Sequence, residues 1–125
     1  MEADLLQQRL SILLPQLTTI LDAMAREVAA VAFAPDSLRI LPHTSAEFRL
    51  EKDPSSGEYG VAGEWREGHG LKVGTLIFNS DGSFFVEQDI VLQHPTKPQW
   101  FVEAVTAWGR GERVQTELRL IPMVR

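Results

Sequence analysis

The sequence contains no cysteine among its 125 residues. Disulfides within the chain, zinc–thiolate centres and thiolate nucleophiles are therefore excluded. No apolar run approaches the roughly 18 residues that a membrane span requires. The opening segment Met1-Glu2-Ala3-Asp4 is acidic where a secretory signal would be basic. We therefore expect a cytoplasmic protein that has no membrane partner.

Positive charge is also scarce. Lys and Arg number 12 against 17 Asp and Glu, which gives a formal net charge of -5. The cations are scattered and never run three together, so the sequence offers no basic patch for a phosphate backbone. We expect no nucleic-acid partner, whereas a basic protein would be attracted.

The first 34 residues predict one helix, because apolar side chains recur at spacings of three and four. Pro15 removes one backbone hydrogen bond within this stripe, which keeps its phase, and therefore predicts a kinked but continuous helix. Pro35 and Asp36 are expected to end it. The apolar stripe consists of Leu6, Leu10, Leu13, Leu14, Leu17, Leu21, Met24, Val28 and Val31.

The remaining residues alternate between apolar and polar side chains, with turn residues between the runs. This pattern predicts a single α+β domain over 1–125, in which the helix packs on one face of an antiparallel sheet of about five to six strands in meander order. Residues 99–108 fit both a helix and a strand, and their β-branched and aromatic content favours the strand. The other expected strands span 38–41, 46–51, 58–66, 71–78, 84–92 and 114–120.

The dipeptide Asp81-Gly82 lies between two apolar runs and predicts the central hairpin. A two-residue turn would place Ile77 opposite Val86 and Thr75 opposite Gln88. A type I turn with a glycine bulge would instead place Phe78 opposite Phe84. Both faces of the hairpin remain rather apolar in either register, so the face turned away from the helix needs a cover of its own.

Signatures of catalysis are missing. His43, His69 and His94 lie in predicted loops, without the spacing of a metal motif. The glycines at 57, 60 and 63 lack the strand-to-helix context of a dinucleotide loop, and more simply mark a twist or a close approach within a strand. Glu87 and Asp89 share one face of a strand, which is common on solvated sheets. We expect no catalytic residue, metal or cofactor.

Two functions follow from this pattern. The first is a non-enzymatic module that binds another protein or a second copy of itself, with Trp65, Arg66, Phe85 and Val91 as the partner surface. The second is a small-molecule site or an enzyme, with Tyr59, Thr75 and Gln88 supplying polar groups to a pocket between helix and sheet. Thr75 and Gln88 can alternatively satisfy each other as a cross-strand pair.

In its acidic composition, its N-terminal helix and its Asp81-Gly82 hairpin, the chain resembles some small bacterial immunity and antitoxin proteins. The resemblance implies a basic toxin as the partner. It rests on composition and expected topology, and not on a motif.

Overall fold

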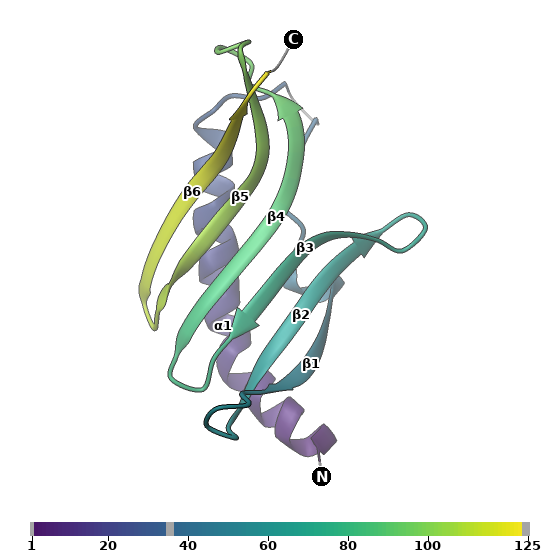
Figure 1. Cartoon of the computed structure of the whole chain (residues 1–125), viewed down its shortest axis with the longest axis vertical. Helices are drawn as coiled ribbons and strands as arrows, with labels where there is room; N and C mark the ends of the chain where they lie inside the picture. The colour runs from purple at the N-terminus through teal and green to yellow at the C-terminus, as the bar shows by residue number, and fades with distance from the viewer. Residues whose placement is uncertain (1, 35–36, 124–125) are drawn as a thin grey trace.

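The chain forms one helix and a six-stranded antiparallel sheet, as the sequence predicts (Figure 1). The computed structural model describes residues 2–34 and 37–123. Each strand pairs with its neighbours in the sequence, so the strand order is β1-β2-β3-β4-β5-β6. The elements are α1 (Glu2–Ala29), a short 3-10 helix η1 (His43–Ser45), β1 (Ala46–Lys52), β2 (Tyr59–Glu67), β3 (Leu71–Phe78), β4 (Ser83–Gln93), β5 (Trp100–Arg110) and β6 (Arg113–Pro122).

Helix α1 packs the predicted apolar stripe against the sheet, with Leu17 and Met24 fully enclosed. Ile20, which the predicted stripe did not include, is fully enclosed as well. The helix continues through Pro15, and the kink there stays a prediction. It ends at Ala29, earlier than the expected residue 34. Just beyond Ala29, the N–H groups of Val31 and Ala32 bond to the carbonyls three residues earlier instead of four. Ala32 then adopts a left-handed φ of 61°, which a continuing helix does not allow. The expected stop at Pro35 and Asp36 lies outside the described residues.

The central hairpin adopts the second of the two predicted registers. Phe78 lies opposite Phe84, and Leu76 lies opposite Val86. Gly82 donates its N–H to the carbonyl of Asn79 at 3.0 Å and has a φ of 89°, as in a type I turn followed by a glycine bulge. The ambiguous residues near position 100 form strand β5, which confirms the interpretation from their β-branched and aromatic content.

The connection between α1 and β1 differs from expectation, since residues 38–41 do not form a strand. Their backbone is held by side chains of the sheet instead. The amide of Gln88 bonds to both the N–H and the carbonyl of Leu41, at 2.8 and 3.0 Å. The indole N–H of Trp65 donates to the carbonyl of Pro42 at 2.9 Å. The connection therefore lies against the core and adds to the cover of one sheet face.

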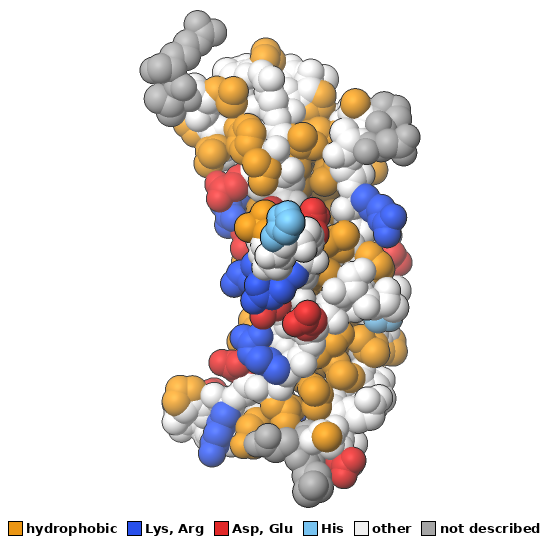
Figure 2. Space-filling view, turned by 90° about the vertical axis from the view of Figure 1, so that its right-hand side faces the viewer, with side chains coloured by type: hydrophobic (Ala, Val, Ile, Leu, Met, Phe, Trp, Pro, Cys, Tyr) orange, Lys and Arg blue, Asp and Glu red, His pale blue; other side chains and the backbone are white. Residues whose placement is uncertain are grey.

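Helix α1 crosses behind the sheet in Figure 1 and contacts both outer strands, β1 and β6. In the described part of the chain, no element covers the opposite face. The outline of the molecule is bowed, and its sheet side curves inward at mid-height (Figure 2). The described chain holds no helix with both the length and the apolar character to cross a membrane.

Candidate functional site: the open face of the sheet

The face of the sheet that points away from α1, here called the open face, carries two parallel rows of side chains. Strand register places Ala62, Ile77, Phe85 and Trp108 opposite one another across β2, β3, β4 and β5, and these four residues form the apolar row. One step along the strands, the register places Glu64, Thr75, Glu87, Thr106 and Glu117 in line, with Glu47 on β1 at the end, and these residues form the acidic row.

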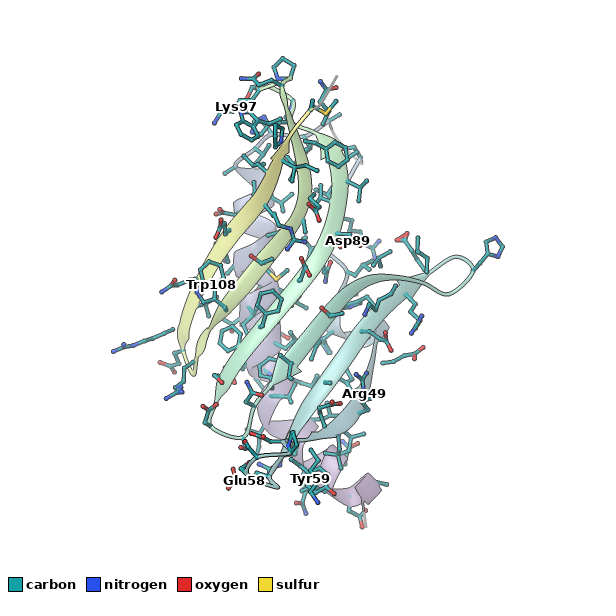
Figure 3. All side chains as sticks on the ribbon, viewed as in Figure 1. Arg49, Glu58, Tyr59, Asp89, Lys97 and Trp108 are labelled. Carbon is teal, nitrogen blue, oxygen red and sulfur yellow. The ribbon has the colours of Figure 1, made fainter. Side chains whose placement is uncertain are left out.

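The apolar row follows directly from the alternation of the strands. A glycine bulge in the central hairpin puts Phe84 and Val86 into the core, which turns Phe85 outward. Phe85 keeps 39% of its surface exposed, while Ile77 and Trp108 beside it are half-buried. Polar residues flank the row, with Arg49 opposite Ala62 and Gln115 opposite Trp108; Arg49 and Trp108 are labelled in Figure 3. The open face therefore presents Ile77, Phe85 and Trp108 side by side as one apolar band, whereas Ala62 at the end of the row is buried.

Acidic side chains outnumber basic ones on this face. Glu47 and Glu64 lie directly opposite each other on β1 and β2, an arrangement of like charges that destabilises a sheet. The side chains of Glu64 and Glu87 are each only 20% exposed, so part of their hydration is lost. The acidic residues of the open face are Glu47, Glu51, Glu64, Glu87, Asp89, Glu103 and Glu117; the basic ones are Arg49, Arg66, Lys72, Arg119 and, at the end of the face near the β5–β6 turn, Arg110 and Arg113.

Two arginines form ion pairs with several of these carboxylates. Arg49 contacts Glu51 at 3.4 Å and Glu64 at 3.8 Å. Arg119 forms ion pairs with both Glu87 and Glu103. Glu64 also pairs with Arg66, which balances the charge of the first cluster, whereas the single cation Arg119 leaves a net negative charge beside Glu87 and Glu103.

Asp89 shows the consequence of this crowding. Its side chain reaches solvent, yet partial desolvation by the sheet raises its pKa above the ordinary 3.8, and the negative charge of Glu87 raises it further. Arg119 opposes the shift without cancelling it. A cationic group brought to this part of the face by a partner would therefore relieve the repulsion among the carboxylates.

Val91 lies at an irregularity of β4, where the pairing with β5 shifts between Asp89 and Leu92. Its φ is 58°, in the left-handed region that β-branched residues avoid, and it is 59% exposed. Such a conformation costs about 1–2 kcal/mol for a residue other than glycine. Strained backbone conformations of this kind cluster at functional sites.

The structure separates the residues of the sequence-predicted partner surface. Phe85 and Val91 are exposed, and Arg66 is exposed and paired with Glu64 at 3.0 Å. Trp65 is fully buried and belongs to the core instead. The indole fits there because Gly74 lies opposite it: a Cβ at Gly74 would come within 2.8 Å of the ring.

The structure does not bring Tyr59, Thr75 and Gln88 together. Thr75 faces Glu87 on the open face, whereas Gln88 points into the core opposite Gly74 and bonds to Leu41. Thr75 and Gln88 therefore do not pair with each other. Tyr59 lies at the far end of the sheet, where β2 begins, beside Lys52 (Figure 3).

Sequence reasoning missed Ile77 and Trp108, which extend the exposed surface of Phe85 into a row. The alternation of β3 and β5 was a signal for both residues, but their alignment depends on the register of two hairpins at once. Among residues 2–34 and 37–123, no group of His, Asp and Glu is arranged to hold a metal ion. Comparison of the chain with protein-family models, curated proteins and solved structures finds no match.

Proposed function

We propose that this protein is a non-enzymatic binding module whose open face docks a protein partner that presents basic side chains beside an apolar surface. The observation that carries the proposal is the apolar row next to the acidic row on the uncovered face of the sheet. The profile of the molecule curves inward on this side (Figure 2). Aromatic side chains are enriched at protein interfaces, and the surrounding carboxylates favour a cationic partner.

The same charges disfavour a second copy of the chain as the occupant. Two copies meeting through their open faces would bring two acidic rows together, in a protein whose net charge is already -5. Like-charge contacts across an interface are unfavourable and slow the association. A basic toxin, the partner implied by the likeness to immunity and antitoxin proteins, would meet the same requirements.

The experiment compares partner binding by the wild-type chain and by single variants in an extract of the native host. Phe85→Asp places a charge in the apolar row and should abolish retention of the partner. Leu71→Asp is the matched control, because Leu71 is 69% exposed at the start of β3, beside the β2–β3 turn that projects from the sheet (Figure 1). Glu117→Lys on β6 should weaken binding and reduce its dependence on salt.

Light scattering of the purified chain gives its oligomeric state, which distinguishes a foreign partner on the open face from a second copy of the chain. A monomer that retains a basic protein through Phe85 and Glu117 supports the proposal. A dimer that dissociates with Phe85→Asp would assign the face to a second copy. Equal retention of partner by the wild type and a folded Phe85→Asp variant would overturn a role for the open face.

A further inference from the structure

A groove runs along the N-terminal half of α1, away from the two rows of the open face. One hollow of about 510 Å³ lies between α1 and the β5–β6 turn, with Ile12, Pro15 and Val114 in its lining. A smaller hollow of about 150 Å³ lies between α1 and the β3–β4 turn, with Arg9 and Ser80 in its lining. Ile12 and Gln16 line both hollows, so the two adjoin, and together they form the helix groove.

Arg9 is unusual among the arginines of the described chain. Arg49, Arg66, Arg110 and Arg119 are exposed and form ion pairs, and Arg26, Arg39 and Arg113 form none with a described residue but are exposed to solvent. Arg9 is partly buried and forms no ion pair with a described residue. Its Nε is the one fully buried side-chain nitrogen or oxygen without a hydrogen-bond partner among the described residues. Buried cationic groups are normally paired, and an unsatisfied one calls for an explanation.

The surroundings of Arg9 favour a singly charged anion. Because Nε is buried, the donors that a ligand can reach are the two terminal nitrogens of the guanidinium, whose planar fork of N–H groups matches a carboxylate. Asn79 and Tyr59 also line the small hollow. The Ser80 hydroxyl donates to the carboxylate of Glu58 at 2.6 Å, so a negative charge already lies nearby. This second negative charge disfavours a doubly charged phosphate more than a carboxylate.

The rest of the groove suits a hydrocarbon chain. Ile12 is 73% exposed, the highest exposure of any large apolar residue in the described chain, and it separates the two hollows. Pro15 and Val114 continue the apolar surface toward the β5–β6 turn. Glu112 lines the far hollow and repels an anionic group there, so the charged end of a ligand belongs at Arg9. The larger hollow alone has the volume of an ordinary small-molecule site.

We propose that the helix groove binds an amphipathic monocarboxylate, with its carboxylate on Arg9 and its hydrocarbon chain along Ile12, Pro15 and Val114. The site shares no residue with the apolar row or the acidic row, so it stands or falls independently of the proposed docking function.

The test titrates the full chain with decanoate, below the concentration at which decanoate forms micelles, by calorimetry. Saturable binding of one decanoate per chain is expected. Arg9→Met should weaken it at least tenfold, because the apolar replacement keeps the stem of the side chain and removes the charge. Arg26→Gln, at an exposed arginine of the same helix, should leave binding unchanged. Decanol lacks the carboxylate and acetate lacks the chain, so both should bind far more weakly.

A second measurement separates ligand binding from a structural role of Arg9. Without ligand, Arg9→Met should melt at the same temperature as the wild type or higher, since it removes a partly buried charge that has no partner. Decanoate should raise the melting temperature of the wild type and not that of the variant. Decanoate binding that persists in Arg9→Met, equal binding of decanol, tighter binding of inorganic phosphate, or no saturable binding at millimolar decanoate would each overturn the proposal.

Discussion

The side-chain amide of Gln88 hydrogen-bonds to both backbone polar groups of Leu41, which lies in the segment that joins the helix to the sheet. The amide thus replaces the strand partner that residues 38–41 would otherwise need. Gln88 is only 3% exposed, and a buried amide is tolerated there because both of its functional groups are satisfied.

Replacing Gln88 with leucine should therefore destabilise the fold despite the apolar gain. Gln88→Leu leaves the N–H and the carbonyl of Leu41 without partners, at a cost of about 1–3 kcal/mol in the free energy of unfolding. Denaturant unfolding measures this loss, and hydrogen exchange should show faster exchange at the Leu41 amide. Gln115→Leu on exposed β6 is the control, expected within roughly 0.5 kcal/mol of wild type. Unchanged exchange at Leu41 would contradict the assigned role.

Asp89 and Asp81 should respond to pH with opposite signs. Burial and Glu87 raise the pKa of Asp89, so the folded state binds a proton more tightly than the unfolded state, and ionisation opposes folding. Asp89→Asn should therefore stabilise the protein at pH 7, by less than about 1 kcal/mol because the group is exposed. The gain should vanish as the pH falls below 3.8, where the wild-type carboxyl is protonated in both states.

The hydrogen bonds that Asp81 accepts from the hydroxyl and the N–H of Ser83 lower the pKa of Asp81, with help from Arg110. The ionised carboxylate therefore contributes stability above pH 3.8, and this contribution disappears as the pH falls through the lowered pKa. Asp81→Asn should be less stable than wild type at pH 7 and approach it in acid. Thermal melts of both variants between pH 3 and pH 7 test the pair, and shifts of equal sign at pH 7 would refute this account.

Alanine should be tolerated very differently at Gly82, in the β3–β4 turn, and at Gly109, near the end of β5. At Gly82, with a φ of 89°, a Cβ would meet only the side chain of Arg110 at 3.7 Å. The cost of Gly82→Ala is then the left-handed backbone, about 1–2 kcal/mol. At Gly109 a Cβ would lie 1.8 Å from the carbonyl oxygen of Arg113, so the β5–β6 ladder has to move. Gly109→Ala should cost more than Gly82→Ala in denaturant unfolding, and the reverse order would refute the proposed close approach.

Relief of the strain at Val91 should stabilise the protein. Asparagine adopts the left-handed region more readily than valine does, and Val91 buries little surface that would be lost. Val91→Asn should raise the free energy of unfolding by about 1 kcal/mol, less than the full left-handed cost. Phe85→Asn, at an exposed position with ordinary strand geometry, should give no gain. A lower melting temperature for Val91→Asn would show that the side chain of Val91 stabilises the fold.

The fold was predictable where local patterns suffice, as in the stripe of α1 and the alternation of β1 to β6. The end of α1 at Ala29 was not, because it depends on a backbone turn at Ala32 that no residue type signals. The roles of Trp65 and Gln88 depend on partners at Pro42 and Leu41, far away in the sequence. The alignment of the apolar row from Ala62 to Trp108 likewise depends on the register of consecutive hairpins. The turn residues did not determine that register, because Asp81-Gly82 was compatible with two pairings.

The strict neighbour order of the strands has a consequence for how the chain assembles. Hairpins that join consecutive strands close short loops, so the sheet can grow one hairpin at a time at a small entropic cost for each step. Docking of α1 against β5 and β6 joins opposite ends of the sequence and is the contact of longest range. Docking of the helix should therefore be the rate-limiting step of folding. Substitutions at Leu17 or Ile20 should slow refolding more than substitutions in the turns.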